Sequence, residues 1–360
     1  MMERFSCGTE IISGMGSMQA LKELSPRRLM VVTDPFFYEN GTAGKLAALA
    51  NAGETAFFSE VAPDPTVELA ARGTAEVRAF RPDVLVALGG GSTMDLAKAM
   101  AWFSGCKPKL VAVPTTSGSG SEVTDFAVLT HDGVKHPLVD GALQPDLAIL
   151  DGNLLTGLPP KLVADCGFDA LSHAVEAYTA KNAGAVTDAL AKEAFCRIFR
   201  DLRASFQGDQ GVRLGIHEAS TMAAMAFNRA GLGLCHALSH SLGGAFHIPH
   251  GRLNAILLPV MPELNPEAAD RYAELARAAG LGGAAKSLCL RSLKSGLIRL
   301  RRELGMPGSL REAGVDPRKL RQMLPGLVET TLKDPCCATN RTPVEGDLVR
   351  RVLEEVAEGG

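Results

Sequence analysis

Short, uninterrupted apolar runs alternate with stretches of helical spacing along the first 150 or so residues of the chain. The runs are rich in Val, Leu and Ala and lie at residues 29–33, 56–61, 84–88, 110–113 and 148–150. Runs without polar alternation are typical of strands that are buried on both faces. The intervening segments 66–80 and 93–103 have helical spacing, and this alternation predicts a parallel sheet with crossover helices.

Helical spacing dominates the rest of the chain. The sequence Leu158-Pro159-Pro160 suits a hinge or a helix entry, and no convincing strand pattern occurs from residue 161 onward. A last helix is expected at 345–358, after a loop at 330–343. We therefore expect an α/β dinucleotide-binding domain at 1–155 and an all-helical metal-binding and substrate domain at 156–360.

Composition excludes several classes of protein. The 360 residues are 46% hydrophobic and 21% charged with a net charge of -3, which excludes a disordered chain, a fibre and a nucleic-acid binder with a basic excess. The cationic stretch 291–305 has the spacing of a helix with a solvated face. No apolar run reaches the roughly 18 residues of a membrane span, and the N-terminus has no secretory pattern. The eight scattered cysteines include no CxxC, which favours reduced thiols in the cytoplasm.

A glycine-rich loop follows one of the predicted buried strands. Gly89-Gly90-Gly91-Ser92 joins the run 84–88 to a helix, and glycines let a ligand approach the free N–H groups of a helix start. The combination suits a phosphate, although the loop is not GxGxxG and a tight turn before a capped helix explains it equally well.

Two other strand ends carry polar residues. Asp34 follows the run 29–33 and is placed to hydrogen-bond a ribose 2′-hydroxyl and to repel a 2′-phosphate; a plain Asp-Pro turn is the alternative. Small hydroxyl residues at 115–120 follow the run 110–113 and suit a pyrophosphate or a nicotinamide, or a flexible polar loop. Because ligands of open α/β sheets bind at the carboxyl ends of strands, the three elements together favour a nucleotide.

Histidines with helical spacing occur in the second half. Asp169 and His173 are four residues apart, as are His236 and His240, and His250 follows 14 residues after His236. One carboxylate with several imidazoles suits a divalent transition metal. Any single histidine is more often a core or surface residue, but unpaired imidazoles among small apolar neighbours are costly, which favours the metal. The remaining histidines are interpreted as structural, namely His131, His136 and His217, or as lying near the pocket, namely His247.

These segments resemble the iron-containing (group III) alcohol dehydrogenase family. The resemblance extends over essentially the whole chain and is carried by GGGSTMDLAKA, PTTSGSGSEVTDFAVLT, LPPKLVADCGFDALSHAVEAY and GLGLCHALSHSLGGAFHIPHGRLNAILLP. FFSEVAPDPT, AWFSG, KHPLVDGALQPDLAILD and ATNRTP are similar to the subgroup of 1-propanol dehydrogenases from propanediol-degrading bacteria. The resemblance implies a Rossmann-like parallel-sheet domain followed by an all-α domain, the dehydroquinate synthase-like architecture, with the site in the cleft.

The resemblance also implies roles for individual residues. The metal ligands would be Asp169, His173, His236 and His250, with His240 beside the substrate and the nicotinamide. The cofactor residues would be Gly90, Gly91, Ser92 and Asp95 at the pyrophosphate, Asp34 favouring NAD over NADP, Thr115 and Thr116 contacting the cofactor, and Lys135 near a ribose.

The implied activity is NAD-linked interconversion of a small primary alcohol and its aldehyde. A Lewis-acidic ion would lower the pKa of the alcohol, and the alkoxide would release hydride to the nicotinamide. Iron(II) is the ion that the resemblance implies, and zinc(II) also suits the donor set. His240 would either pass the hydroxyl proton outward or shape the pocket. The family also implies a homo-oligomer, and residence in a bacterial microcompartment stays open because no targeting peptide is evident.

The chain departs from the family pattern at two places. Asp64-Pro65-Thr66 stands where Asn-Pro-Thr is frequent, and Asn340-Arg341-Thr342-Pro343 stands where Asn-Pro-Arg is frequent.

Other functions remain open at this point. A dehydroquinate-synthase-like lyase would need several cations near the metal, whereas the sequence offers only Arg229 and Arg252 there. A glycerol dehydrogenase is a closer alternative. A metal-dependent hydrolase would leave the glycine loop and Asp34 unexplained, and a noncatalytic binding module would not need both sites.

Overall fold

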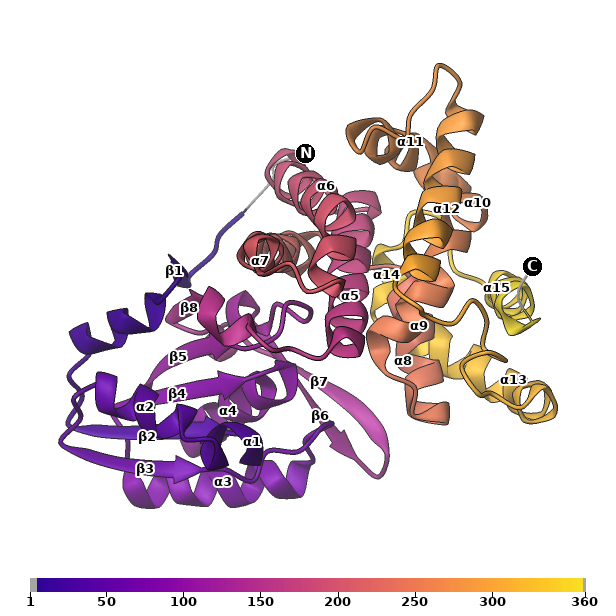
Figure 1. The fold of residues 1–360 in the computed structure, drawn as a ribbon. Helices are drawn as coiled ribbons and strands as arrows, with labels where there is room; N and C mark the ends of the chain where they lie inside the picture. The colour runs from indigo at the N-terminus through magenta and orange to yellow at the C-terminus, as the bar shows by residue number, and fades with distance from the viewer. Residues whose placement is uncertain (1–4, 359–360) are drawn as a thin grey trace. The chain divides into compact units, whose positions relative to one another are not determined.

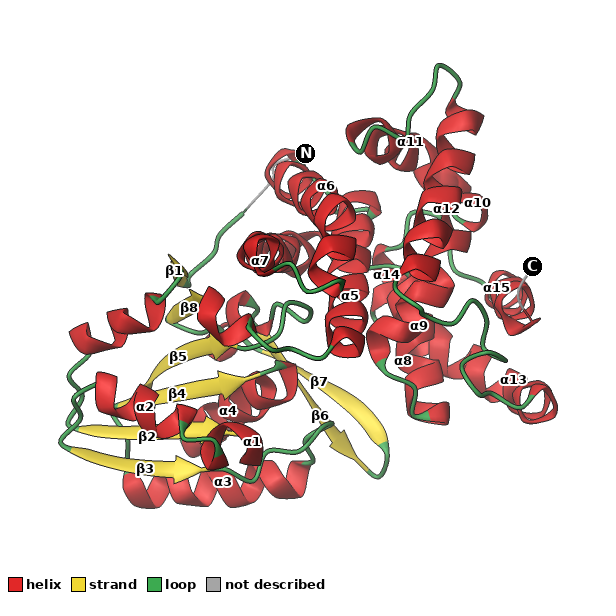
Figure 2. Cartoon of the chain, in the orientation of Figure 1, coloured by secondary structure: helices red, strands yellow, loops and turns green. Residues whose placement is uncertain are grey.

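A computed structural model describes residues 5–358 (Figure 1). The chain divides into two compact units, one of residues 6–157 and one that begins at Leu158. Figure 2 shows that all the strands belong to the first unit and that the second is built from helices. The predicted fold class, a parallel-sheet domain followed by an all-helical domain, is therefore confirmed.

The first unit is built on a six-stranded parallel sheet in the order β1-β8-β5-β4-β2-β3. Its strands are β1 (Glu10–Gly14), β2 (Arg28–Thr33), β3 (Glu54–Phe58), β4 (Val84–Gly89), β5 (Lys109–Pro114) and β8 (Leu147–Asp151). The helices of this unit are α1 (Pro35–Glu39), α2 (Thr42–Leu49), α3 (Val67–Phe80) and α4 (Gly91–Ser104), with short 3₁₀ turns between elements.

The central strands are buried because apolar layers cover both faces of the sheet. One layer packs Met30, Leu85 and Ala112 against α3 and α4, and the other packs Val31 and Val86 against α2. Along the chain β2 is followed by β3, which lies on one side of β2 in the sheet, and then by β4, which lies on the other side. The direction in which strands are added to the sheet therefore reverses, and the switch point lies between β2 and β4. Open α/β sheets bind ligands at such a switch point.

Three strands of this unit were not predicted. Strand β1 has a mixed, largely exposed pattern, and strands β6 (Phe126–His131) and β7 (Val134–Val139) form a separate antiparallel hairpin in which β7 is mostly exposed. Their sequences lack the continuous apolar runs that identify the central strands. The run predicted at 56–61 is a strand only at Glu54–Phe58.

Fifteen α-helices are described, and eleven of them belong to the second unit. They are α5 (Pro160–Thr179), α6 (Ala185–Phe206), α7 (Arg213–Ala230), α8 (Leu234–Phe246), α9 (His250–Leu257), α10 (Met261–Leu264), α11 (Ala269–Ala278), α12 (Lys286–Glu303), α13 (Pro317–Lys333), α14 (Cys336–Thr339) and α15 (Gly346–Glu358). The segment 330–343, predicted as a loop, holds the end of α13 and the short α14.

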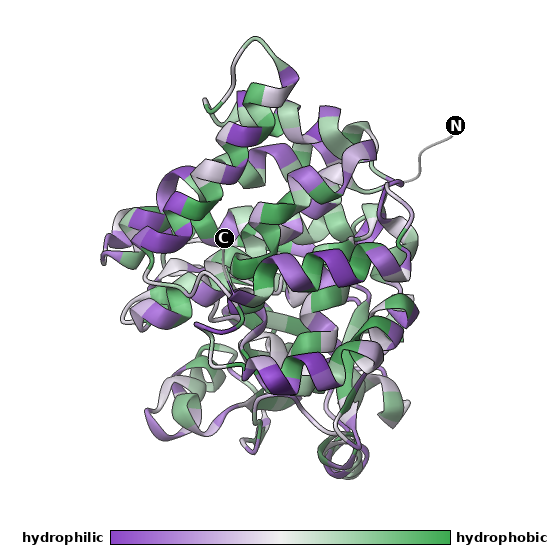
Figure 3. Cartoon of the chain, turned by 90° about the vertical axis from the view of Figure 1, so that its right-hand side faces the viewer, coloured by the Kyte–Doolittle hydropathy of each residue, from purple (hydrophilic) through white to green (hydrophobic). Residues whose placement is uncertain are grey.

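Helical periodicity explains which faces are buried. In α15 the buried residues Val349, Val352, Leu353 and Val356 recur at the spacing of one helix face, and Figure 3 shows green and purple stretches alternating along the helices. Helix α5 is instead buried along most of its length, because α6, α7 and α9 pack around it. A Cβ atom on Gly167 would meet a Leu202 methyl group at 2.2 Å, so a larger residue would force Leu202 to move where α6 packs on α5.

No described helix is long and apolar enough to cross a membrane. All eight cysteines are free thiols.

Candidate metal centre and nucleotide-binding loops

The predicted metal ligands come together in the helical unit. Asp169 and His173 lie one turn apart on α5, His236 lies in the first turn of α8, and His250 is the first residue of α9. The three Nε2 atoms surround one oxygen, Oδ1 of Asp169, at 3.9 Å (His173), 3.9 Å (His236) and 3.6 Å (His250). Residues up to 81 positions apart in sequence, from 169 to 250, thus converge on one point.

These separations fit a single ion. Ligand atoms about 2.1 Å from a tetrahedral zinc or similar ion lie about 3.4 Å from one another, close to the 3.6–3.9 Å between the imidazole nitrogens and Asp169. One donor atom from each of Asp169, His173 and His236 also falls within 4.8 Å of the others. Asp169, His173 and His236 can therefore hold a divalent cation with little movement, whereas His250 lies near Asp169 but outside this group of three.

Burial favours the form of His236 that a metal needs. His236 is 1% exposed and His173 is 6% exposed, and their rings stack at 4.5 Å. Burial, together with the neighbouring histidines, lowers the pKa of His236 well below its ordinary value. A neutral imidazole has a lone pair for an ion, so this shift favours the form of His236 that can bind one.

The approach of α9 to α5 brings His250 to the site. A Cβ atom on Gly251 would lie 1.7 Å from the carbonyl oxygen of Asp165, so only glycine allows the two backbones to come this close. The following residue, Arg252, donates to both carboxylate oxygens of Asp165, with Nη2 2.8 Å from Oδ2 and Nε 3.3 Å from Oδ1. The backbone contact and the ion pair together fix where α9 begins.

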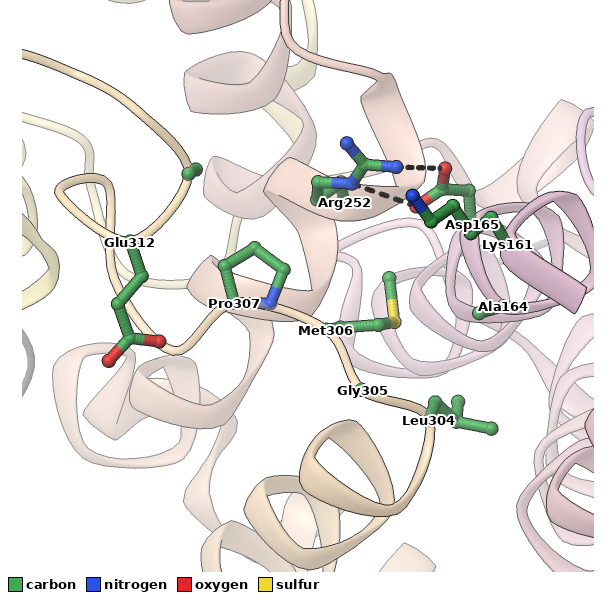
Figure 4. Close-up of a pocket in the computed structure, with 10 residues that line it drawn as sticks. Lys161, Ala164, Asp165, Arg252, Leu304, Gly305, Met306, Pro307 and Glu312 are labelled. Carbon is green, nitrogen blue, oxygen red and sulfur yellow. Dashed lines mark hydrogen bonds and ion pairs between the residues drawn. The ribbon is translucent and has the colours of Figure 1, made fainter.

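A surface cavity of about 380 Å³ opens beside this ion pair (Figure 4). It is lined by Lys161, Ala164, Asp165, Arg252, Leu304, Gly305, Met306, Pro307, Glu312 and Ala313. Arg252 was one of two cations expected near the metal, and the structure commits its guanidinium to Asp165. This pairing weakens the case for a strongly anionic substrate.

Two residues around the ligands escaped prediction. Glu176 accepts a hydrogen bond from His236 Nδ1 at 2.6 Å, and Asn254 donates from Nδ2 to Asp169 Oδ1 at 2.9 Å. Burial raises the pKa of Glu176 to about 7, although hydrogen bonds from the backbone N–H groups of Cys235, Gly233 and His236 act to lower this pKa. Carboxylates and amides in this position orient metal ligands. Glu176 stands three residues after His173 in the same segment, which was the one available signal.

His240 lies next to the predicted ligands. Its ring stacks on that of His250 at 5.1 Å, and its Nδ1 lies 2.8 Å from Asp334 Oδ2. Although burial opposes it, the hydrogen bond and charge of His240 hold the pKa of Asp334 below its ordinary value. An ionised carboxylate only accepts, so Nδ1 carries the hydrogen, and Nε2 is the acceptor in the neutral form of the ring. Asp334 was not predicted, because it comes from the segment expected to be a loop.

In the sheet unit, the glycine loop joins β4 to α4. Gly89 has φ +158°, and a Cβ there would meet Thr93 Oγ1 at 2.2 Å. Gly90 is the N-cap of α4. A Cβ atom on Gly90 would lie 3.2 Å from Thr116 Oγ1, and a Cβ atom on Gly91 would lie 2.9 Å from Ser119 Oγ. The structure thus brings Gly90, Gly91 and Ser92 at the helix start beside the threonine-containing loop.

Asp34 directly follows β2, on the other side of the switch point. Its Oδ1 accepts from Phe37 N at 3.0 Å and caps α1, so the Asp-Pro turn considered as the alternative is present. Thr33 Oγ1 donates to Leu88 O at 2.8 Å, which ties this strand end to the one before the glycine loop. The capping bond uses one carboxylate oxygen, and a ribose contact by the other stays a prediction.

Asp95 and Lys98 of α4 fasten the loop that follows β5. Asp95 accepts from Ser121 Oγ at 2.7 Å and from Val128 N at 3.1 Å, and buried Lys98 donates to Thr124 O and Phe126 O, each at 2.9 Å. Burial lowers the pKa of Lys98 to about 8. The carboxylate of Asp95 is therefore engaged in holding the loop, and its predicted pyrophosphate role is untested.

The other predicted cofactor residues lie on separate segments. Buried Thr115 donates its N–H to Gly89 O at 3.0 Å, next to the glycine loop, and Thr116 is partly buried beside Gly90. Lys135 lies on the β6–β7 hairpin and forms an ion pair with Asp64 at 2.7 Å. Asp64 lies at one of the two places where the chain departs from the family pattern, and its carboxylate pairs with Lys135.

Comparisons with known proteins agree with this arrangement. Residues 8–152 match the family described as iron-containing alcohol dehydrogenase, and residues 163–357 match the Fe-containing alcohol dehydrogenase family, C-terminal. The chain is 39% identical to 1-propanol dehydrogenase PduQ of Citrobacter freundii, over 99% of this chain and 100% of that protein. It is 35% identical to an NADPH-dependent butanol dehydrogenase of Clostridium saccharobutylicum, over 99% of each.

The comparison with solved structures finds the same family. An iron-containing alcohol dehydrogenase from Thermococcus thioreducens matches with a TM-score of 0.91 and 34% identity, over 99% of this chain and 100% of that one.

Proposed function

Because the chain belongs to the iron-containing alcohol dehydrogenase family, we propose that it interconverts a short primary alcohol and its aldehyde, using NAD(H) and a divalent ion, iron(II) or else zinc(II). The observation that carries the proposal is the convergence of three imidazole Nε2 atoms within 3.6–3.9 Å of Asp169 Oδ1. Propanol or a similar alcohol is the proposed substrate, since relatives are named for propanol and butanol.

Asp169, His173, His236 and His250 would hold the ion, and the loops around Gly90 and Thr116 would hold the dinucleotide. When bound, the ion supplies Lewis-acid polarisation of the substrate oxygen and the nicotinamide supplies the hydride acceptor or donor. The protein's own contribution is placement, because buried rings and helix starts keep the donor atoms fixed.

His240 is the residue that we propose for the hydroxyl proton. Asp334 holds Nδ1–H, which leaves Nε2 to accept a proton from the substrate side. The side chain of His240 is 39% exposed, so its ring can exchange that proton with solvent. Its stacking on His250 keeps the ring next to the ligands.

The choice of NAD over NADP is proposed from Asp34. The carboxylate stands at the switch point of the sheet, where it would repel a 2′-phosphate. One relative is named as NADPH-dependent, so both cofactors belong in any assay.

The test is a substrate panel on anaerobically purified protein loaded with iron(II) or zinc(II). We expect NADH oxidation with aldehydes from acetaldehyde to butyraldehyde, highest near propionaldehyde, and little activity with NADPH. The His236→Ala variant should be inactive with the whole panel. Absence of turnover by the metal-loaded wild type with every aldehyde and alcohol would contradict the proposal, and a preference for glycerol and dihydroxyacetone would assign the polyol alternative.

A further inference from the structure

We propose that Glu176 is a positioning residue of the metal centre, which fixes the ring of His236 and holds the first turn of α8 against α5. The inference rests on the proposed role of His236 as a metal ligand. Glu176 is not among the four proposed ligands, and its carboxylate lies on the far side of the His236 ring, at Nδ1 rather than at Nε2.

Four hydrogen bonds converge on the carboxylate of Glu176. Oε1 accepts from Cys235 N at 2.8 Å. Oε2 accepts from Gly233 N at 3.0 Å, from His236 N at 3.2 Å and from His236 Nδ1 at 2.6 Å. The side chain is 3% exposed, so water does not replace any of these partners.

This arrangement determines the form of both groups. Two carboxylate oxygens offer about four lone-pair sites, and an ionised carboxylate has no hydrogen to donate. Since donors surround the group, the charged form of Glu176 is the one that satisfies all of them. His236 must then carry its hydrogen on Nδ1, and Nε2 presents its lone pair toward Asp169, where an ion would sit.

The carboxylate also completes the start of α8. The first N–H groups of a helix have no partner within the helix and form the positive end of its dipole. Glu176 accepts three of these N–H groups, and Asn340 Oδ1 accepts the remaining one, from Leu234, at 3.2 Å. A Cβ atom on Gly233 would lie 2.7 Å from Glu176 Oε1 and 2.8 Å from Asn340 Oδ1, so the two caps fill the space around the N-cap.

Helix α5 therefore controls three of the four ligands. Glu176 lies three residues after His173 and seven after Asp169, which places all three on one face of α5. Asp169 and His173 are supplied directly, and His236 is placed through Glu176. Asn340 caps the same helix but contacts no proposed ligand in the hydrogen bonds described, which makes it a matched control.

The experiment is a cobalt(II) titration of metal-free full-length protein, followed by its visible absorption and by competition with a chelator. We expect Glu176→Gln to weaken cobalt binding by roughly 10- to 100-fold and to alter the visible spectrum. Glu176→Asp keeps the charge on a shorter side chain and should bind cobalt with a Kd between those of the wild type and Glu176→Gln. Asn340→Ala should lower the Tm of the metal-free protein, as Glu176→Gln does, while keeping the wild-type Kd and spectrum.

The outcomes separate this inference from the proposed function. Wild-type Kd and spectrum in Glu176→Gln, or in Glu176→Asp if the glutamine variant does not fold, would overturn the positioning role while leaving the metal centre intact. Equal losses of cobalt affinity in Asn340→Ala and Glu176→Gln would overturn it as well, because helix capping alone would then explain the effect. Failure of the wild type to bind cobalt would instead contradict the proposed function.

Discussion

The helical unit and the sheet unit use their polar side chains differently. In the helical unit, donor atoms of Asp169 and three histidines point at one another, and buried partners such as Glu176 hold them from behind. In the sheet unit, the predicted side chains are engaged in holding the fold: Asp34 caps a helix and Asp95 fastens a loop.

Under the proposed function, the two kinds of binding would reside in different units. A metal is held by side chains, and the helical unit keeps those side chains turned inward and oriented. A dinucleotide phosphate is held by backbone N–H groups at a helix start, and the sheet unit supplies them through the glycines between β4 and α4. Substitutions of side chains should therefore have larger effects in the helical unit than in the sheet unit.

The largest effect is expected for His236→Ala. Removing this buried imidazole takes one donor from the proposed set and leaves Glu176 without its ring partner. We expect metal content to fall below one tenth of the wild-type value and kcat/KM to fall by roughly 1,000-fold, about 4 kcal/mol of transition-state stabilisation. Metal analysis with steady-state kinetics measures both, His131→Ala is the exposed control, and normal turnover by metal-free protein would refute the metal centre.

The next effect is expected for Gly251→Ala. The added methyl group would stand 1.7 Å from Asp165 O, so α9 must move away from α5 and carry His250 with it. We expect a loss of about 1–3 kcal/mol in the free energy of unfolding and weaker metal binding, measured by denaturant titration and chelator competition. Gly244→Ala is the control, since a Cβ on this helical glycine meets nothing within 4 Å. Equal behaviour of the two variants would show that the close approach is unimportant.

A smaller and more selective effect is expected for Asp34→Ser. Serine retains the helix cap while removing the charge that would face a 2′-phosphate. The ratio of kcat/KM with NADPH to that with NADH should rise by about 10-fold, which is about 1.4 kcal/mol. Asp316→Ser makes the same change in another Asp-Pro cap, at the start of α13, and should leave the ratio alone. An unchanged ratio in Asp34→Ser would remove this residue from cofactor selection.

The smallest effect is expected for the Asp64–Lys135 ion pair, which is partly exposed at 63% and 37%. Asp64→Asn should change the free energy of unfolding by less than about 1 kcal/mol, as exposed pairs do. If Lys135 contacts the cofactor, Lys135→Met should weaken NADH binding more than Asp64→Asn does, measured by fluorescence titration. Equal Kd values for the two variants would limit Lys135 to the ion pair.

The central strands could be predicted because their signal is local. A strand covered on both faces needs an unbroken apolar run, and β2, β4, β5 and β8 each have one. The β6–β7 hairpin was missed because β7 is largely exposed and carries Lys, His and Pro among its apolar residues. Burial by other parts of the chain, rather than local pattern, determines such strands.

The same limit applies to the candidate sites. Pairs four residues apart on one helix, such as Asp169 with His173, are visible in the sequence. The partners that orient ligands are not, because Glu176 reaches the start of α8 across 57 positions and Asp334 reaches His240 across 94. The sequence also did not reveal that Asp95 bonds to Ser121 and that Lys135 pairs with Asp64, because these residues come together only in the folded chain.

The central claim is that one ion is held jointly by Asp169, His173, His236 and His250. Anomalous X-ray diffraction at the iron edge, on crystals of protein purified anaerobically and loaded with one equivalent of iron(II), tests it most directly. The account predicts a single peak per chain, about 2.0–2.2 Å from a carboxylate oxygen of Asp169 and from the three imidazole nitrogens. A peak bound by other residues, or no peak at this position in fully loaded protein, would contradict the account.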